Sequence, residues 1–401
     1  MRTDFNDNKL GLFVHWGTYA LTGFHEQAFA RLNMDREKYE GLAKKFDPTK
    51  YDPEKWVLLA KNAGMKYVCF TAKHHDGFCM FDSAYTDYKI TNTPYKKDVL
   101  KELSVACKKH GILLSVYYSL PDWHHPNAFN PNSTHQWKAR TQTENDFSVY
   151  VEYVKNQITE LLTNYGKIYT LFWDIPPHIE IKDVNALARK LQPDILINNR
   201  GFDEGDFSTP ERDYDVIRGA MRFSRMTEAC NAVGKQSWGF RKREDYHTLR
   251  YLLSSIDKVM AMGGSYLLNV GPKPDGTIDF RSESIIKAVG KFYNKLGGVL
   301  ENTEPDPFDY GIESGTAIVN KKDGKTYFHF YNGLNCSAAY IKRFPSLPKR
   351  VRLLNSGKDL RYRIEKLPYD MEMGVGDAVL HIYSIPVENY PKEPIVIEIE
   401  W

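Results

Sequence analysis

The chain has 401 residues, of which 42% are hydrophobic and 26% charged, and this composition excludes a wholly disordered or fibrous protein. Its 54 Lys and Arg residues nearly balance 51 Asp and Glu residues, so the net charge is only +3 and no nucleic-acid partner is expected. The five cysteines are scattered without CxxC spacing, which argues against a disulfide framework or a zinc cluster.

Membrane and export signals are also missing from the sequence. No stretch approaches the ~20 consecutive apolar residues of a membrane span, so we expect no membrane partner. The segment from Met1 to Asn8 is polar and lacks the apolar run of a signal peptide. The sequence as it stands therefore predicts a cytoplasmic protein, whereas a periplasmic or secreted protein trimmed of its leader would look the same.

The first 300 residues alternate short apolar runs with amphipathic helical stretches, a pattern typical of parallel strands joined by helices. The apolar runs are Leu12 to His15, Lys66 to Thr71, Ile112 to Tyr118, Ile168 to Trp173, Ile195 to Ile197 and Tyr266 to Val270. Helix ends are marked by Asp52-Pro53 and Gly64, by Asp98 and Gly111, and further helices are predicted near Phe147 to Asn164 and Tyr246 to Met262.

Polar residues gather where these runs end, and this distinguishes a barrel from an open doubly wound sheet. The residues at or just after the run ends are His74, His75, Tyr117, Asp174, Arg200 and Asn269. Active sites of (β/α)₈ barrels are built at the carboxyl ends of many strands. No glycine-rich phosphate loop follows the first run. We therefore predict a (β/α)₈-like TIM barrel over residues 1–300.

The character of the sequence changes at about Glu301. Short segments with period-two alternation follow, separated by Gly, Pro and Asn turns. They are Thr316 to Val319, Thr326 to Tyr331, Val351 to Leu354, Ala378 to Tyr383 and Ile395 to Ile399. This pattern predicts a small C-terminal antiparallel β-sandwich over residues 301–401.

Several residues could carry chemistry, and each has a plainer interpretation. Asp174 lies between an aromatic run and Ile175-Pro176-Pro177, where apolar walls would strengthen its electrostatic contacts, but it could instead cap a loop or pair with an arginine. His74 and His75, with His124, could bind a metal, handle protons or bind a polar ligand. Neither Cys partners nor an HExxH helix supports the metal interpretation.

The mixture of His, Trp, Tyr, Asp, Arg and Glu at strand ends is suited to binding a sugar. Aromatic rings can pack on its C–H groups, and charged or imidazole groups can bind its hydroxyl groups. His15-Trp16 ends the first run, although Trp16 could be only a packing residue. Sugar hydrolysis requires two carboxylates with separate roles. The candidates for a partner of Asp174 lie downstream: Asp203, Glu204, Asp206, Glu211 and Glu228.

Four motifs together resemble glycoside hydrolase family 29, the α-L-fucosidases. They are Gly11 to Gly17 (GLFVHWG), Lys73 to Phe78 (KHHDGF), Tyr117 to Ser119 with Asp122 to Pro126 (DWHHP), and Asn269 to Pro272 with Asp275-Gly276. Their order and spacing match from about Leu10 to Gly298. The resemblance implies a (β/α)₈-like barrel followed by a C-terminal β-sandwich, in agreement with the organisation inferred above.

The resemblance also implies roles for individual residues. Asp174 corresponds to the nucleophile, and Glu211, in the segment Asp206 to Glu211, corresponds to the general acid/base, with Glu228 as the reserve candidate. The residues matched to substrate binding are His15, Trp16, His74, His75, Tyr117, Trp123, Arg200 and Trp238. Neither a metal nor an organic cofactor is implied.

The expected function is that of a retaining exo-α-L-fucosidase acting on fucosylated oligosaccharides or glycoconjugates. Asp-Ile-Pro-Pro at 174–177 and the DWHHP run resemble the subgroup that acts on α-1,3/1,4-linked fucose. On this hypothesis Trp123, His124 and His125 would meet the next sugar at the rim. The alternatives are a degenerate fucose-binding protein on the same fold and a metal-dependent hydrolase using His74, His75 and His124. The sequence gives no prediction of oligomeric state.

Overall fold

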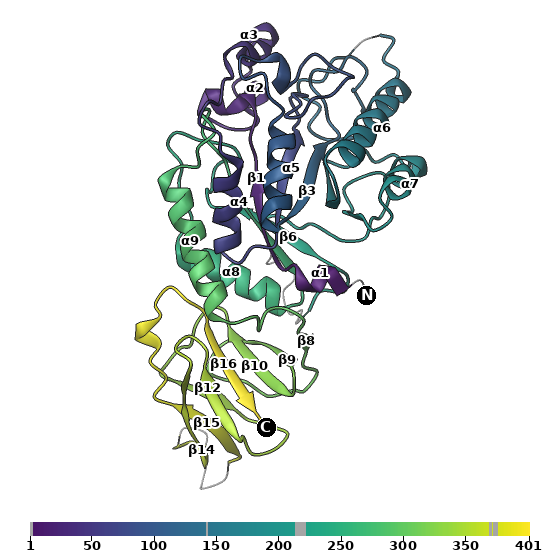
Figure 1. Ribbon diagram of the computed structural model, residues 1–401. Coiled ribbons are helices and arrows are strands. Elements are labelled where there is room, and N and C mark those ends of the chain that lie inside the picture. Colours follow the sequence, from purple (N-terminus) through teal and green to yellow (C-terminus); the bar gives the residue numbers. More distant parts are fainter. Residues whose placement is uncertain (1–2, 142, 213–221, 369–370, 372–375) are drawn as a thin grey trace.

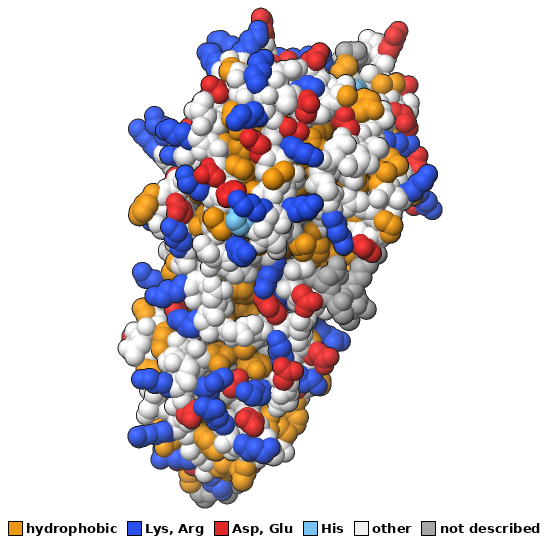
Figure 2. All heavy atoms as spheres, in the orientation of Figure 1, with side chains coloured by type: hydrophobic (Ala, Val, Ile, Leu, Met, Phe, Trp, Pro, Cys, Tyr) orange, Lys and Arg blue, Asp and Glu red, His pale blue; other side chains and the backbone are white. Residues whose placement is uncertain are grey.

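The structure is a computed structural model, and it describes residues 3–141, 143–212, 222–368, 371 and 376–401. Figure 1 shows two parts stacked end to end, with an α/β part above and an all-β part below that holds the C-terminus. Lys/Arg and Asp/Glu side chains are interspersed over the face of both parts seen in Figure 2. No helix among the described residues is long and apolar enough to cross a membrane.

A seven-stranded parallel sheet forms the centre of the α/β part. Its strands are β1 (Leu10–Val14), β2 (Tyr67–Lys73), β3 (Leu113–Ser119), β4 (Ile168–Asp174), β5 (Leu196–Ile197), β6 (Glu228–Ala232) and β7 (Ser265–Val270). The order is β5-β4-β3-β2-β1-β7-β6. Nearly every strand residue is buried, because helices cover one face and the curled sheet encloses the other.

The two edge strands of this sheet are linked by an irregular segment, residues 207–211. Phe207 forms a parallel bridge with Asn198, just after β5, while Ser208 and Glu211 bridge to Thr227 and Cys230 at β6. The segment thus occupies the position of an eighth strand, although it makes only isolated bridges. The sheet is therefore TIM-barrel-like, as predicted. It consists of seven regular strands, and segment 207–211 takes the place of an eighth.

Nine α-helices are described, and the longer ones cover the outer face of the sheet (Figure 1). They are α1 (Thr3–Asp7), α2 (Ala28–Arg31), α3 (Arg36–Glu40), α4 (Pro53–Asn62), α5 (Val99–His110), α6 (Phe147–Asn164), α7 (Lys182–Leu191), α8 (Leu249–Ala261) and α9 (Phe280–Lys295). Short 3₁₀ helices span Thr18–Thr22, Gly41–Lys45, Ile90–Asn92 and Val387–Asn389. The predicted ends of α5 are confirmed: the Asp98 carboxylate accepts from the Lys101 amide, and Gly111 closes the helix at φ 68°.

The C-terminal part contains two antiparallel sheets that share one core. The larger is ordered β13-β12-β16-β10-β9-β8 and the smaller β11-β15-β14. The strands are β8 (Glu304–Pro305), β9 (Ile318–Lys322), β10 (Lys325–Phe330), β11 (Ala338–Ile341), β12 (Arg350–Leu353), β13 (Lys358–Asp359), β14 (Arg361–Lys366), β15 (Ala378–Tyr383) and β16 (Ile395–Glu400). Phe328 and Ile397 of the larger sheet belong to the same buried cluster as Leu380 and Ile382 of the smaller.

The two parts are joined by a continuous buried interface. Helix α8 lies against β9 and β10, and the buried cluster that surrounds the parallel sheet extends to Ile318, Tyr327 and Val396 of the C-terminal part. Within this interface the Asp257 carboxylate of α8 and Nδ1 of His329 in β10 lie 2.9 Å apart, and both side chains are fully buried.

Candidate active site

A pocket of about 120 Å³ opens at the carboxyl ends of the barrel strands. Phe13 of β1 and Phe172 of β4 form an apolar floor, with their ring centroids 5.2 Å apart. His15, His74, His75 and Tyr117 line the wall, since each follows or ends one of the strands β1 to β3. Barrel active sites occupy this end of the strands.

Asp174, the last residue of β4, is a pocket carboxylate held by two donors. Its Oδ1 accepts from Nη1 of Arg200 at 2.9 Å and its Oδ2 accepts from the Tyr117 hydroxyl at 2.7 Å. Burial acts to raise the pKa of Asp174, but the Arg200 guanidinium, with His75 and the Tyr117 hydroxyl, outweighs it, and the pKa lies below its ordinary value. Asp174 is therefore an ionised carboxylate in an apolar setting.

The Arg200 guanidinium also binds Glu211, another carboxylate of the pocket. Nη1 of Arg200, which binds Asp174, also donates to Oε1 of Glu211, and Nη2 donates to the Thr209 carbonyl. Glu211 is half exposed at the mouth, whereas Asp174 is only 8% exposed. Because both carboxylates accept from one nitrogen, their nearest oxygens lie no more than about two hydrogen-bond lengths, roughly 6 Å, apart.

Two buried imidazoles present an acceptor nitrogen to the pocket. Nδ2 of Asn269 donates to the Trp238 carbonyl, so its Oδ1 is an acceptor and takes the Nδ1 hydrogen of His15 at 2.7 Å. The Ser119 hydroxyl donates to the Pro121 carbonyl and accepts from Nδ1 of His75 at 2.6 Å. Burial lowers the pKa of each histidine to about 4, so both are neutral at pH 7 with a free Nε2 lone pair.

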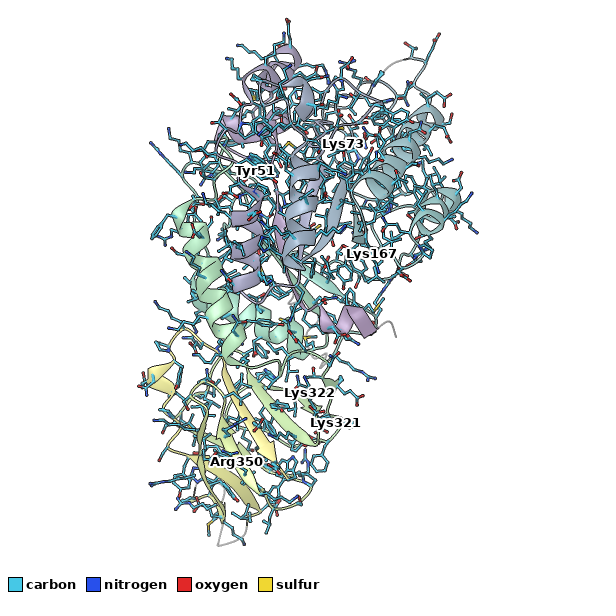
Figure 3. The ribbon with its side chains drawn as sticks, viewed as in Figure 1. Tyr51, Lys73, Lys167, Lys321, Lys322 and Arg350 are labelled. Atoms are coloured by element: carbon cyan, nitrogen blue, oxygen red, sulfur yellow. The ribbon has the colours of Figure 1, made fainter. Side chains whose placement is uncertain are left out.

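His74 lines the pocket, whereas the preceding residue, Lys73, fastens a loop beside it. The His74 ring stacks on Tyr117 with centroids 5.7 Å apart, and its buried Nδ1 has no partner among the described residues. Lys73, labelled in the α/β part in Figure 3, does not line the pocket. Its Nζ pairs with the Asp122 carboxylate at 2.7 Å and donates to the Tyr150 hydroxyl of α6 at 2.9 Å. This buried ion pair ties the end of β2 to the loop after β3.

The structure corrects the predicted roles of Trp16 and Trp123. Successive side chains alternate at the end of β1, so Trp16 points away from His15 and packs on Phe46, Tyr51 and Trp56. Trp123 is fully buried, and its indole donates to the His135 carbonyl at 2.7 Å. Neither tryptophan lines the pocket; both hold its loops in place. Trp238, by contrast, lines it, beneath the guanidinium of Arg212 at 4.7 Å.

Glu228, the reserve candidate for the acid/base, lies in the wrong part of the barrel. It is the first residue of β6, at the opposite end of the sheet from Asp174, and is 1% exposed. The Tyr67 hydroxyl donates to its Oε2. Burial raises the pKa of Glu228 to about 7. The predicted rim residues are also engaged elsewhere: His124 contacts Glu40, and His125 packs on Tyr153.

Sequence reasoning missed three residues that line the pocket, Glu26, Gln27 and His135. Oε2 of Glu26 accepts from the Ser237 hydroxyl at 2.7 Å and from the amides of Trp238 and Gly239. Burial acts to raise the pKa of Glu26, but His25 and these donors bring it below its ordinary value. All three residues come from loops without a motif or periodicity, so no sequence signal marked them.

The metal alternative finds no ligand set in the described residues. No three His, Cys, Asp or Glu side chains among them are grouped as metal ligands would be. His124, the third predicted ligand, is paired with Glu40 at 3.1 Å rather than directed toward His74 and His75. The pocket instead combines the carboxylates of Glu26, Asp174 and Glu211 with an arginine, aromatic rings and neutral imidazoles, which is the chemistry of a sugar site.

The barrel with two carboxylates on one arginine defines the class of the protein as glycoside hydrolase. A family model described as Alpha-L-fucosidase matches residues 1–298, and the chain belongs to this α-L-fucosidase family. The curated α-L-fucosidase of Branchiostoma floridae is 26% identical over 354 residues, which cover 80% of this chain and 76% of that protein.

Solved structures agree over nearly the whole chain. Alpha-L-fucosidase isoenzyme 1 from Paenibacillus thiaminolyticus has a TM-score of 0.81 at 30% identity, covering 99% of this chain and 97% of that one. An α-L-fucosidase GH29 from Bacteroides thetaiotaomicron, a trapped covalent intermediate in complex with 2-fluoro-fucosyl fluoride, has a TM-score of 0.80 at 25% identity, covering 99% and 95%. The similarity therefore includes the C-terminal sheets, beyond the segment that the family model matches.

Proposed function

We propose that the chain is a retaining exo-α-L-fucosidase that removes terminal fucose from oligosaccharides or glycoconjugates by double displacement. The observation that carries this proposal is the shared nitrogen of Arg200, which binds Asp174 and Glu211 at once. Retaining glycosidases have carboxyl groups ~5 to 5.5 Å apart and inverting ones ~6.5 to 9.5 Å apart. An upper limit of roughly 6 Å between the nearest oxygens favours retention.

The first half of the reaction uses the two carboxylates in different states. Asp174 attacks the anomeric carbon while Glu211, in its acid form, gives its proton to the departing glycosidic oxygen, so a fucosyl ester forms as the glycosidic bond breaks. The lowered pKa of Asp174 supports its role, because the nucleophile must be ionised. The half-exposed position of Glu211 supports the other role, since the acid must meet the aglycone and later a water molecule.

The second half reverses the proton transfer. Glu211, now a carboxylate, takes a proton from water as the water oxygen attacks the anomeric carbon and the bond to Asp174 breaks. Both displacements invert the anomeric carbon, so fucose leaves with the configuration it had in the substrate. The trapped intermediate of the Bacteroides relative supports this two-step route.

The binding wall suits a sugar rich in hydroxyl groups. Nε2 of His15 and of His75 can each accept a hydroxyl hydrogen, while the Arg200 guanidinium can donate. Phe13 and Phe172 offer an apolar surface to the C–H groups of the ring. Because both carboxylates are in place on Arg200, a fucose-binding protein that has lost catalysis is not favoured.

We extend the proposal to linkage and favour α-1,3/1,4-linked fucose. The support is the similarity of Asp-Ile-Pro-Pro at 174–177 and of the DWHHP run to that subgroup of the family. The loop that contains the DWHHP run is well anchored, since Asp122 accepts from the amides of His124 and His125 and pairs with Lys73. Comparing kcat/KM for α-1,3/1,4- and α-1,2-linked fucosyl oligosaccharides tests this preference, and equal values would remove it.

Trapping with 2-fluoro-fucosyl fluoride tests the mechanism directly. We expect the protein to gain the mass of one 2-fluorofucosyl group, with the label on the peptide that contains Asp174. Proton NMR of an early reaction mixture should show α-fucose before mutarotation. The Asp174→Asn variant is the matched control, and it should gain no label. A label on another carboxylate, or β-fucose as first product, would overturn the assignment.

A further inference from the structure

Trp137 is an exposed tryptophan beside the pocket that the proposed reaction leaves unused. It is 58% exposed, and it is the one tryptophan among the large hydrophobic side chains exposed in the described part of the chain. Its ring centroid lies 4.7 Å from that of His135, which lines the pocket. The burial of an indole ring is favourable, so its exposed face offers a surface on which an apolar face of a ligand can stack.

The loop that carries Trp137 is fastened to the loop after the nucleophile. The Asn130 amide donates to the Pro177 carbonyl at 2.8 Å, and the Ser133 hydroxyl donates to the Pro176 carbonyl at 3.0 Å. The buried Trp123 indole holds the His135 carbonyl, and its ring lies 6.4 Å from that of Trp137. These contacts set the position of Trp137 relative to Asp174 before any ligand arrives.

A cation lies at the same mouth. Nε of Arg31 donates to Oε1 of Gln27, which lines the pocket. The Arg31 side chain is exposed, and its hydrogen bond to Gln27 is the one that its guanidinium makes among the described residues. A hexose ring has an apolar C–H face and an edge of hydroxyl groups. The exposed ring of Trp137 suits the C–H face, and the exposed guanidinium of Arg31 suits the hydroxyl edge.

We propose that Trp137 is the platform for the sugar to which fucose is linked, with Arg31 donating to a hydroxyl group of that sugar. The inference rests on the fucosidase function proposed above and names a specificity-determining residue for it. The departing glycosidic oxygen must point out of the pocket past Glu211, at the mouth where His135 and Trp137 lie. Binding energy from this second ring can be used in the transition state, so its loss lowers kcat as well as affinity.

The test compares two substrates that differ in the second ring. One is a fucosyl trisaccharide, in which fucose is attached to an N-acetylhexosamine, and the other is α-L-fucosyl fluoride, which has no aglycone ring. For Trp137→Ala we expect kcat/KM for the trisaccharide to fall about tenfold more than kcat/KM for the fluoride. Trp137→Tyr, which keeps an aromatic face, should recover most of this difference, and Arg31→Gln should give a smaller selective loss.

Phe280→Ala is the matched control, since it removes an aromatic ring on α9 that is 85% exposed and does not line the pocket. It should change the ratio of the two kcat/KM values by less than twofold. An equal loss with both substrates in Trp137→Ala, or no loss, overturns the subsite while leaving the fucosidase proposal intact. A wild-type protein that hydrolyses neither substrate overturns the proposed function and the subsite together.

Discussion

The two ends of the barrel each bury a carboxylate, and the two differ in charge. At the carboxyl end, Asp174 is bound by Arg200 and Tyr117, and its pKa lies below the ordinary value in spite of burial. At the amino end, Glu228 has only the Tyr67 hydroxyl, its Oε1 has no partner in the described structure, and burial raises its pKa to about 7.

The difference shows that burial alone does not decide the state of a carboxyl group in this barrel. Both groups lose water, which favours the neutral acid. Asp174 gains a cation within hydrogen-bond distance and stays charged, whereas Glu228 has no cationic partner in the described part of the chain. Asp174 therefore keeps its charge at the end of the barrel where the reaction is proposed to occur, whereas the charge of Glu228 is suppressed at the other end.

The largest expected effect comes from removing the charge at the carboxyl end. Asp174→Asn replaces an ionised oxygen with an amide that cannot form the fucosyl ester, so kcat should fall on the order of 10⁴-fold or more. Steady-state rates with an aryl fucoside measure this. Glu228→Gln makes the same chemical change at the other end and should keep the wild-type rate within a few fold. Similar losses in both variants would contradict the comparison.

The second test removes the cation. Without the guanidinium in Arg200→Gln, the pKa of Asp174 should rise, because burial then acts unopposed. The nucleophile must be ionised, so the acidic limb of the kcat/KM profile should move to higher pH than in the wild type. At pH 7 we expect a loss of about 10²- to 10³-fold, as for other charge-stabilising groups. The check is the pH dependence between pH 3 and 8, and an unmoved acidic limb would refute the role of Arg200.

The third test concerns stability at the amino end. A rise in the pKa of Glu228 from 4.5 to about 7 means that the folded state holds a proton which the unfolded state has lost, so this contribution to stability declines as pH rises from 4.5 to 7. The full difference corresponds to about 3 kcal/mol. Glu228→Gln should therefore gain stability over the wild type by up to this amount at pH 8, and by much less at pH 5.

Denaturant unfolding of both proteins at several pH values provides the measurement. The wild-type curve alone is ambiguous, because His15 and His75 act in the opposite direction: their pKa values of about 4 make the folded state lose stability as pH falls from 6.5 to 4. Subtracting the two curves cancels the histidines and isolates Glu228. A difference that does not depend on pH would rule out the buried acid.

The sequence predicted the parts of the barrel in which apolar residues run together. The runs at Ile112 to Tyr118 and Ile168 to Trp173 became β3 and β4 to within one residue. Strand β6 was not predicted, because its sequence EACNA has only small or polar side chains. Segment 207–211 was not predicted as a strand either. Its few bridges depend on the two edge strands beside it, and its own sequence has no strand-like alternation of apolar residues.

The site divides in the same way. Strand ends placed His15, Tyr117 and Asp174 correctly in the pocket, because the carboxyl ends of parallel strands converge. Glu211 came only from the family resemblance, and the structure brings it to Arg200. The prediction that Trp16 lines the pocket was wrong, because side chains alternate at the end of β1 and Trp16 points outward. Glu26 was missed because it lies in a loop, and only tertiary packing brings a loop residue to the pocket.

The interface between the two parts has a consequence for how the chain can be divided. Cutting after residue 298, where the family match ends, would strip the cover from α8 and leave the Asp257 carboxylate without His329. The cut would also expose apolar side chains of the barrel cluster that pack on Ile318, Tyr327 and Val396, and each large side chain exposed in this way costs roughly 1.5 to 3 kcal/mol. We therefore expect the barrel not to fold stably by itself, and calorimetry of the full chain should record one cooperative transition in which both parts melt together.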